Sequence, residues 1–328
     1  MTPQTCKNRI TGIGSALVDI LINETDDFLR KLNKKKGGMT LVDSDDIKAI
    51  LAKTDNPPAV VPGGAACNTI IGVGRLGGAA RFIGRRGDDN FGTLFEDALR
   101  SAHVAPELTV SSSPTGSVIS VITPDAQRSM FTYLGASTEM APHRITPALF
   151  ADTAITMIEG YLLFNPELMM AAVHAAKKAG SMIALDLASF EVVNACREIL
   201  EDLIIDHVDI LIANEDEAGA FTGYSDEKNA LQALSAHVTC GVLKLGKRGS
   251  VVCFNGRTTR ISAMSGKEAK DTTGAGDLWA AGFLFGIANG FSVEKSGELA
   301  SACGYEVCQV IGAQIPETGW ERIRALIY

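Results

Sequence analysis

The sequence has little positive charge, no long hydrophobic run and no closely paired cysteines. Its 328 residues include 30 Lys and Arg against 38 Asp and Glu, which gives a formal net charge of −8. Such a charge repels nucleic-acid backbones and anionic membranes. No stretch reaches the roughly 18 apolar residues of a membrane helix, and the polar first nine residues do not resemble a signal peptide. We therefore expect neither a nucleic-acid partner nor a membrane partner.

The cysteines are too scattered for a zinc site or a disulfide framework. The seven occupy positions 6, 67, 196, 240, 253, 303 and 308, and none forms a C-x-x-C pair. The five histidines also lack metal-ligand spacing. Free thiols are typical of a reducing compartment, so the sequence predicts a cytoplasmic protein.

The chain does have ample material for a core, because 46% of its residues are hydrophobic. From about residue 150 onward, short apolar runs alternate with amphipathic segments. Strands are predicted over 153–158, 182–187, 208–213 and 242–245, and helices over 166–179, 191–206, 215–221 and 230–237. This alternation predicts an α/β fold with a mostly parallel sheet and helices on both of its faces.

The first half of the chain departs from this alternation. Residues 115–123 and 129–134 alternate like exposed antiparallel strands on either side of a Pro-Asp turn, which predicts a hairpin. We predict a single domain over 1–328 with a small β-strand lid built from about 15–45 and 113–136. Ligands bind at the carboxyl ends of parallel strands, so the lid would lie over that edge of the sheet.

Two glycine patterns match nucleotide-binding motifs only in part. Residues 72–77 fit G-x-G-x-x-G, but they lie late in a predicted helix, whereas a dinucleotide fingerprint follows a strand and opens a helix. We interpret these glycines as positions where a helix packs closely on the sheet. Residues 241–248 nearly fit a P-loop, but Arg248 replaces the magnesium-binding hydroxyl and the strand lies inside the motif. We reject both as nucleotide motifs.

A third glycine pattern has the context that phosphate binding requires. Asp271 to Asp277 reads D-T-T-G-A-G-D and precedes an apolar run that predicts a buried helix. Bare N–H groups of Gly274, Ala275 and Gly276 at the helix start would form an anion site. Asp277 in the first turn would accept the proton of a hydroxyl that attacks a phosphoryl group. Alternatively, Asp277 only interacts with the helix dipole and the glycines form an ordinary turn.

A second, separate segment favours the chemical interpretation. Gly63 and Gly64 lead into a helix that carries Asn68 near its start, where the amide can pair with sugar hydroxyls. Asp19 follows Gly12-Ile13-Gly14-Ser15 and offers a carboxylate suited to a diol. Either segment alone is equally consistent with a turn or a helix cap.

With both segments, the sequence resembles the ribokinase-like superfamily, the PfkB family of carbohydrate kinases, over essentially its whole length. Residues 63–68 and 81–92 resemble the N-terminal signature of the family, and 271–277 resembles its C-terminal signature without departure. The resemblance implies a three-layer α/β/α ribokinase-like fold. It also implies a kinase that transfers the γ-phosphate of ATP to a small hydroxylated metabolite.

The resemblance further implies roles for individual residues. Asp277 corresponds to the catalytic base, and Gly274 to Gly276 to the anion hole. Asn214 and Glu217 correspond to an N-x-x-E motif that organises Mg²⁺ through water. Residues implied in nucleotide binding are Asn214, Lys244, Gly246, Gly249, Thr272, Gly274 and Gly276, and those implied in acceptor binding are Asp19, Gly63, Gly64 and Asn68.

Within the superfamily, residues 12–20 and 128–136 resemble the adenosine-kinase-like branch. Arg128 is a candidate to reach the transferred phosphate from the lid, or else an ordinary solvated arginine. Phe131 or Tyr133 is a candidate to stack on a base, or else part of the lid core. The predicted acceptor is therefore the CH₂OH group of a nucleoside, with a free sugar of the ribose or fructose type as the alternative.

The predicted cofactors are ATP and Mg²⁺, with a monovalent cation such as K⁺ near Asp271 and Thr273, as is common in the family. The predicted partner is the small-molecule substrate, and the chain is expected to be a monomer or a homodimer. Two other classes of function stay open at this point. One is a catalytically silent ligand-binding regulator on the same fold. The other is a dinucleotide-dependent oxidoreductase, for which the G-x-G-x-x-G match is the only support.

Overall fold

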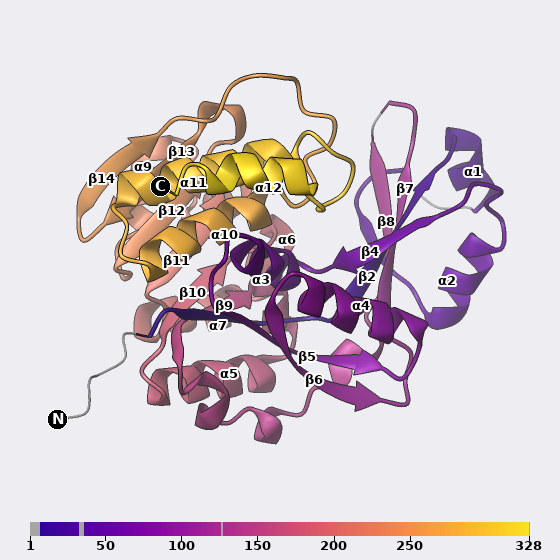
Figure 1. The fold of residues 1–328 in the computed structure, drawn as a ribbon, viewed down its shortest axis with the longest axis horizontal. Helices are drawn as coiled ribbons and strands as arrows, with labels where there is room; N and C mark the ends of the chain where they lie inside the picture. The colour runs from indigo at the N-terminus through magenta and orange to yellow at the C-terminus, as the bar shows by residue number, and fades with distance from the viewer. Residues whose placement is uncertain (1–6, 33–35, 126, 328) are drawn as a thin grey trace.

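The computed structural model describes residues 7–32, 36–125 and 127–327, which form two β-sheets with flanking helices (Figure 1). The larger sheet has nine strands in the order β14-β13-β12-β11-β10-β9-β1-β5-β6. Its strands are β1 (Arg9–Ile13), β5 (Ala80–Gly87), β6 (Val104–Ser111), β9 (Thr153–Glu159), β10 (Met182–Asp186), β11 (Ile210–Asn214), β12 (Cys240–Lys244), β13 (Ser250–Phe254) and β14 (Arg257–Ile261). All neighbours from β6 to β12 are parallel, and β13 and β14 add an antiparallel edge.

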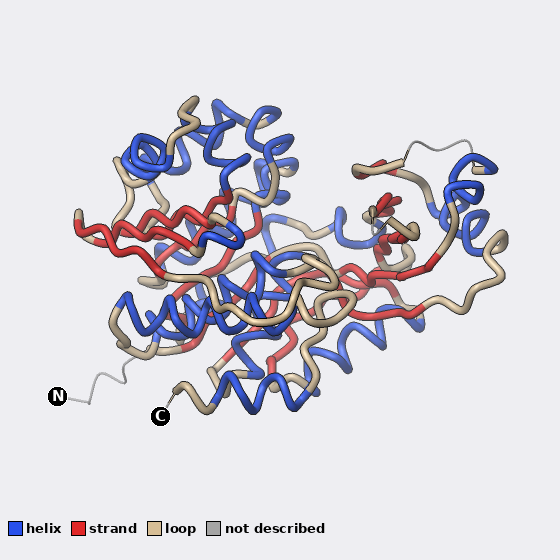
Figure 2. The backbone as a smooth tube through the Cα atoms, turned by 90° about the horizontal axis from the view of Figure 1, so that it is seen from above, coloured by secondary structure: helices blue, strands red, loops and turns tan. Residues whose placement is uncertain are grey.

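Helices cover both faces of the large sheet, as the tube in Figure 2 shows. One face is packed by α3 (Ala65–Arg75), α4 (Asn90–Ser101), α10 (Ala275–Ala288), α11 (Val293–Val307) and α12 (Glu317–Arg324). The other is packed by α5 (Pro166–Lys178), α6 (Phe190–Ala195), α7 (Arg197–Asp206), α8 (Glu215–Thr222) and α9 (Glu227–Leu234). The predicted three-layer α/β/α arrangement is confirmed. In the part of the chain that is described, no helix is both long enough and apolar enough to cross a membrane.

Two predicted helices have different bounds in the structure. The helix predicted over 191–206 is divided into α6 and α7, because Cys196 leaves the helical conformation at φ −120° and ψ 22°. The helix predicted over 230–237 begins earlier, since the Asp226 side chain accepts the N–H of Asn229 and caps α9 at its start. Both differences concern helix ends, where local hydrogen bonds outweigh the periodicity of apolar residues.

The smaller sheet has the strand order β3-β8-β7-β2-β4. Its strands are β2 (Leu17–Asn23), β3 (Met39–Leu41), β4 (Ala59–Gly63), β7 (Gly116–Ile122) and β8 (Arg128–Tyr133), and α1 (Asp26–Lys31) and α2 (Ser44–Leu51) lie beside it (Figure 1). β7 and β8 form the predicted antiparallel hairpin, but β2 and β7 are parallel, so the sheet is mixed. β4 lies outside the two segments that the sequence assigned to the lid.

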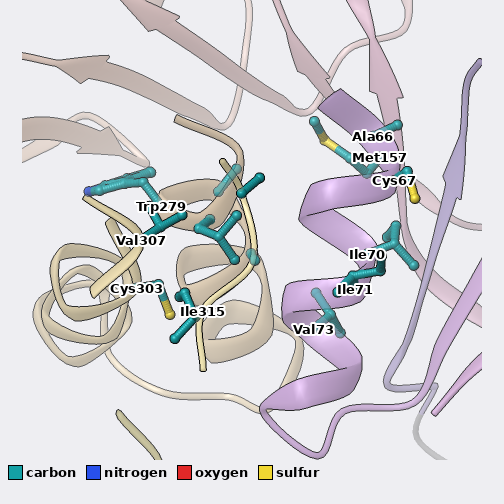
Figure 3. Packing of buried hydrophobic residues seen from close by; sticks show 14 of the residues in the cluster. Ala66, Cys67, Ile70, Ile71, Val73, Met157, Trp279, Cys303, Val307 and Ile315 are labelled. Atoms are coloured by element: carbon teal, nitrogen blue, oxygen red, sulfur yellow. The ribbon is translucent and has the colours of Figure 1, made fainter. Parts of the chain in front are cut away.

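The two sheets share one hydrophobic core. Ile20 and Ile119 of the small sheet and Phe28 of α1 belong to the same buried cluster as Ile70 of α3 and Phe283 of α10. Figure 3 shows side chains of α3 packed in this cluster with Trp279, Cys303 and Val307. The shared core holds the small sheet against the large one.

The glycines of the G-x-G-x-x-G match lie inside or just after α3, and not at a strand-to-helix turn. An added Cβ on Gly72 would come within 2.5 Å of the Cβ of Ala281 in α10. An added Cβ on Gly74 would come within 2.1 Å of the carbonyl oxygen of Ala102. The glycines therefore allow α3 to approach other helices, in addition to the sheet that the sequence analysis expected.

We predict that Gly74→Ala lowers the free energy of unfolding by about 1–3 kcal/mol, because the methyl group overlaps a backbone carbonyl. The measurement is urea denaturation. Gly219→Ala in α8 is the matched control, since its added Cβ has its nearest neighbour at 3.7 Å. That change should be neutral or stabilising through helix propensity, and equal loss in both variants would contradict the packing argument.

Candidate active site

Four neighbouring parallel strands end in polar or charged residues. β9, β10, β11 and β12 end at Glu159, Asp186, Asn214 and Lys244, each after a mostly buried apolar run. The carboxyl ends of parallel strands share one edge of the sheet, where α/β proteins bind ligands. Sequence motifs indicate two of these residues, Asn214 and Lys244, but give no role to Glu159 or Asp186. The available signal for both was an acidic residue at the carboxyl end of a buried apolar run.

Asp277 lies in the first turn of α10 and contacts the start of α3. Asn68 Nδ2 donates a hydrogen bond of 2.9 Å to Asp277 Oδ2, and Thr69 Oγ1 donates one of 3.1 Å to the Asp277 carbonyl oxygen. Burial raises the pKa of Asp277 to about 7, although the Asn68 hydrogen bond opposes this rise. Nearby Asp186 raises the pKa further, while Lys244 lowers it. The carboxyl group is thus tuned to change protonation near neutral pH.

The predicted acceptor residues lie together at the start of α3. An added Cβ on Gly63 would come within 2.5 Å of Asp19 Cγ, so the glycine leaves room for that carboxylate. Gly64 has φ 93° and caps α3, a conformation that favours glycine. Burial raises the pKa of the Cys67 thiol, and the charges of Glu159, Asp19 and Asp277 raise it further. Three carboxylates from three elements therefore surround this helix start.

Asn68 itself is 5% exposed. Its Nδ2 is occupied by Asp277, but its buried Oδ1 has no hydrogen-bond partner among the described residues. A buried acceptor of this kind costs free energy unless something donates to it. A ligand hydroxyl at this point would satisfy it.

Glu159 links the two segments that carry the predicted acceptor residues. The side chain is 2% exposed, and burial raises its pKa. Its Oε1 accepts the N–H of Ser15 at 2.8 Å, and its Oε2 accepts the N–H of Ala66 at 3.0 Å. The carboxylate thus fixes the β1–β2 connection against the start of α3.

The helix start at residues 274–276 differs in one respect from the predicted anion site. Gly274 has the left-handed conformation at φ 71° and caps α10. Ala275 N donates 3.1 Å to Thr272 O, so this N–H closes a turn, which corrects the expectation of three bare donors. Within the described chain, Gly274 N and Gly276 N show no protein acceptor. These two N–H groups and the helix dipole favour an anion here.

Lys244 and Asp186 form an ion pair beside this helix start. Lys244 Nζ lies 2.8 Å from Asp186 Oδ2, and the two side chains are only 13% and 8% exposed. An added Cβ on Gly276 would come within 3.0 Å of Lys244 Nζ. Burial alone lowers the pKa of Lys244, but Asp186 and Glu217 outweigh it and raise the pKa above its usual value. The ammonium group is therefore charged.

Asn214 and Glu217 form a reciprocal capping box at the start of α8. Glu217 accepts from Asn214 N and Nδ2, both at 2.7 Å, while Asn214 Oδ1 accepts the N–H of Glu217 at 2.9 Å. Burial, with help from Asp186, raises the pKa of Glu217 to about 7. The negative charge of Asp186 and Glu217 and the side-chain oxygens of Asn214 and Glu217 are suited to Mg²⁺. The described residues include no cluster of three acidic, His or Cys side chains that could hold a metal ion.

A cavity of about 850 Å³ opens at this edge, which is within the size range of cofactor sites. Of the seven predicted nucleotide-binding residues, six line it and Gly274 does not. The six are Asn214, Lys244, Gly246, Gly249, Thr272 and Gly276. Residues 263–269 and Trp279, Tyr305, Cys308 and Gln309 also line the cavity. These residues carry no recognisable motif, because they lie before or after the glycine-rich segment 271–277 or in α11.

Asp271 stabilises the loop before α10. Its Oδ1 accepts from Thr273 N at 3.0 Å and from Thr273 Oγ1 at 2.9 Å, and its Oδ2 accepts the N–H of Gly312 at 2.6 Å. The carboxylate thus connects the helix start to the α11–α12 loop. The monovalent cation expected near Asp271 stays a prediction.

The three lid residues suggested for ligand contact have different outcomes. The backbone of Arg128 begins β8, but its side chain lies outside the described residues, so its role stays a prediction. Phe131 is 1% exposed in the hydrophobic core. Asp19 pairs with Val118, which pairs with Thr132, so Phe131 and Tyr133 lie on the opposite face of the small sheet from Asp19. Phe131 therefore belongs to the lid core, which was the alternative, and base stacking by Tyr133 stays a prediction.

Comparisons with known proteins agree with this geometry. The protein closely matches the structure of a probable sugar kinase from Rhizobium etli CFN 42, with a TM-score of 0.90, 30% identity and coverage of 98% of this chain and 99% of that one. It matches the adenosine kinase of Sinorhizobium meliloti with a TM-score of 0.88, 32% identity and coverage of 97% and 99%. A ribokinase of Arabidopsis thaliana is 28% identical over 281 residues, which are 81% of this chain and 71% of that protein.

The family model described as "pfkB family carbohydrate kinase" matches residues 40–319. This match sets aside the alternative of a dinucleotide-dependent oxidoreductase. That alternative had only the glycine pattern as support, and the pattern lies in and just after α3. The chain belongs to the PfkB family of carbohydrate kinases, phosphotransferases whose acceptor is an alcohol group.

Proposed function

We propose that the protein transfers the γ-phosphate of ATP to the CH₂OH group of a nucleoside of the adenosine type. The observation that supports the chemistry is the pair formed by Asp277 and Asn68. It presents a carboxyl group with a pKa of about 7 next to a buried amide oxygen that lacks a partner. The nucleoside is supported by the 32% identity to the adenosine kinase of Sinorhizobium meliloti over nearly the whole chain.

In the proposed mechanism, Asp19, Gly63, Gly64 and Asn68 hold the acceptor. Asn68 Oδ1 accepts a hydrogen bond from an acceptor hydroxyl and so fixes its orientation. The ionised carboxylate of Asp277 takes the proton of the attacking hydroxyl.

The nucleotide would occupy the cavity lined by Asn214, Lys244 and Gly276. The N–H groups of Gly274 and Gly276 hold negative charge on the transferring phosphoryl group. Asn214 and Glu217 would hold Mg²⁺ through water, and the ion would supply positive charge to the phosphate oxygens. The small sheet excludes water that would otherwise hydrolyse ATP.

A free sugar is the second candidate acceptor. It is favoured by the 30% identity to the probable sugar kinase of Rhizobium etli CFN 42 and by the ribokinase relative. The site also favours a sugar, because Phe131 and Tyr133 lie on the face of the small sheet opposite Asp19. The lid therefore gives no support for stacking of a base beside Asp19. The catalytic proposal for Asp277 is the same for both acceptors.

The first prediction from this proposal concerns the acceptor. ADP release with ATP and Mg²⁺ should be fastest with adenosine in a panel of nucleosides, ribose, fructose and sugar phosphates. Turnover with a free sugar and none with nucleosides would replace the proposed acceptor but retain the kinase mechanism. No turnover with any acceptor, while ATP still binds, would favour the silent regulator.

The second prediction concerns the base. Asp277→Asn should lower kcat by about 10²–10⁴-fold and leave the Kd for ATP within a few-fold, because only proton transfer is lost. Asp202→Asn, an exposed position on α7, is the matched control and should retain wild-type kinetics. A near-normal kcat in Asp277→Asn would remove Asp277 from the mechanism.

The third prediction is a pH profile. Asp277 acts as a base only when ionised, so kcat/KM should fall about tenfold per pH unit below about 7. The Asn68 hydrogen bond lowers the pKa of Asp277. Asn68→Ala should therefore move the acid limb of the profile to higher pH. A limb at the same or a lower pH would show that another group controls the profile.

The fourth prediction concerns stability in the absence of ligands. Folding raises the pKa of Asp277 from 3.8 to about 7, so the folded state binds the proton more tightly. This favours folding at low pH, and the advantage is lost as the pH rises from about 4 to about 7. Asp277→Asn should thus have a higher Tm than the wild type at pH 8, with the difference shrinking toward pH 5. A pH-independent difference would contradict the raised pKa.

A further inference from the structure

We propose that Lys244 is a catalytic residue whose ammonium group contacts the phosphoryl group during transfer, and that Asp186 is the positioning residue that holds it there. The inference rests on the proposed kinase function and deepens it. The resemblance placed Lys244 only among the residues that line the nucleotide. Asp186 had no role.

The position of Lys244 Nζ is defined by contacts on two sides. On one side, Asp186 Oδ2 lies 2.8 Å away. On the other side lies Gly276, where an added Cβ would come within 3.0 Å of Nζ. The ammonium group therefore lies against the first turn of α10, next to the N–H groups of the proposed anion site and one residue before Asp277. An anion at this helix start would be within reach of the ammonium group and of these N–H groups.

Lys244 also has hydrogen-bonding capacity left. An ammonium group has three N–H donors, and Asp186 is its hydrogen-bond acceptor among the described residues. The residue lines the 850 Å³ cavity. A buried cation with free donors beside a cavity is an incomplete site, and phosphate oxygens are the acceptors that would complete it.

The charges around the site explain why a cation is needed here. Asp186 of β10, Glu217 of α8 and Asp277 of α10 all act electrostatically on Lys244. Incoming phosphates would meet these three acids. Lys247 and Lys267 also line the cavity, but both are exposed, so water weakens their effect. The buried ammonium of Lys244 acts where the dielectric is lower and its charge is worth more.

The chemical step is an in-line transfer. A bond forms between the acceptor oxygen and the γ-phosphorus as the bond between that phosphorus and the β–γ bridging oxygen breaks. The electron pair of the broken bond leaves on ADP, and the acceptor proton passes to Asp277. Lys244 exchanges no proton and stabilises the negative charge on the phosphoryl oxygens.

Asp186 is itself held in place by the turn that follows β10. Its Oδ1 accepts the N–H of Ala188 at 3.0 Å, and Ala188 has φ 65°, a conformation that is unusual for a residue with a side chain. Strained backbone persists where the surrounding structure enforces it, and it is concentrated at functional sites. One carboxylate oxygen thus fixes the turn while the other fixes Lys244.

The test compares Lys244→Met with Lys177→Met. Lys177 is a matched control because it forms an ion pair with Asp209 at 2.6 Å, next to the amino end of β11 and away from the site. We expect Lys244→Met to lower kcat by about 10²–10³-fold, as for other groups that stabilise transition-state charge, and Lys177→Met to retain it. Lys244 lowers the pKa of Asp277, so kcat is taken from the plateau of the pH profile. A kcat within threefold of the wild type would overturn the proposal.

A binding measurement separates catalysis from nucleotide holding. Calorimetry compares ADP with ADP plus aluminium fluoride, a mimic of the phosphoryl group in transfer, both with Mg²⁺. Lys244→Met should weaken the fluoride complex by the same factor as kcat and change ADP affinity less than threefold. Equal weakening of both would mean that Lys244 only holds the nucleotide, which overturns its catalytic role. If the wild type phosphorylates no acceptor, the proposed function fails, while these affinities still decide the role of Lys244.

A double-mutant cycle tests the role of Asp186. Asp186→Asn alone should lower the plateau kcat about tenfold, because the ammonium group is no longer held. In the Lys244→Met background it should have no further effect. A full additional loss in the double variant would show that Asp186 acts independently, which would overturn its assignment as the positioning residue.

Discussion

The hydrogen bond between Asn68 and Asp277 joins two segments that are 209 residues apart in the chain, and the geometry of the site depends on it. It can form only because α3 and α10 begin side by side. Their approach is allowed by Gly72, where an added Cβ would contact Ala281 at 2.5 Å. The pair of helices therefore sets the distance between the residues proposed to hold the acceptor and the residue proposed to take its proton.

Around this contact the protein concentrates more negative charge than it neutralises. Glu159, Asp186, Glu217 and Asp277 lie at one edge of the sheet with Lys244. Burial raises the pKa values of Asp277 and Glu217 to about 7, and the negative charge of Asp186 raises both further. Such an arrangement is unfavourable in the empty protein, and a bound cation would relieve it. The proposed functions of Mg²⁺ and Lys244 both follow from this imbalance.

The small sheet contributes Asp19 to the site and shares the core of the large sheet. One face of the small sheet carries Ile20, Ile119 and Phe131 into the common hydrophobic cluster. The opposite face carries Asp19 next to Gly63. Because side chains alternate along a strand, the aromatic residues that would stabilise the lid cannot at the same time lie beside Asp19. The same alternation that anchors the sheet therefore limits which residues are available to recognise an acceptor.

Much of this protein was determined by local sequence. The βαβ alternation, the hairpin at 116–133 and the glycine-rich start of α10 depend on residues close together in the chain, and their patterns predicted them. Only the tertiary structure decided that Asp186 meets Lys244, that Glu159 bridges Ser15 and Ala66, and which face of the small sheet carries Phe131. Those contacts depend on strand order and register, which join distant segments. Periodicity in one strand indicates that its two faces differ, but the neighbouring strands decide what each face and each strand end will contact.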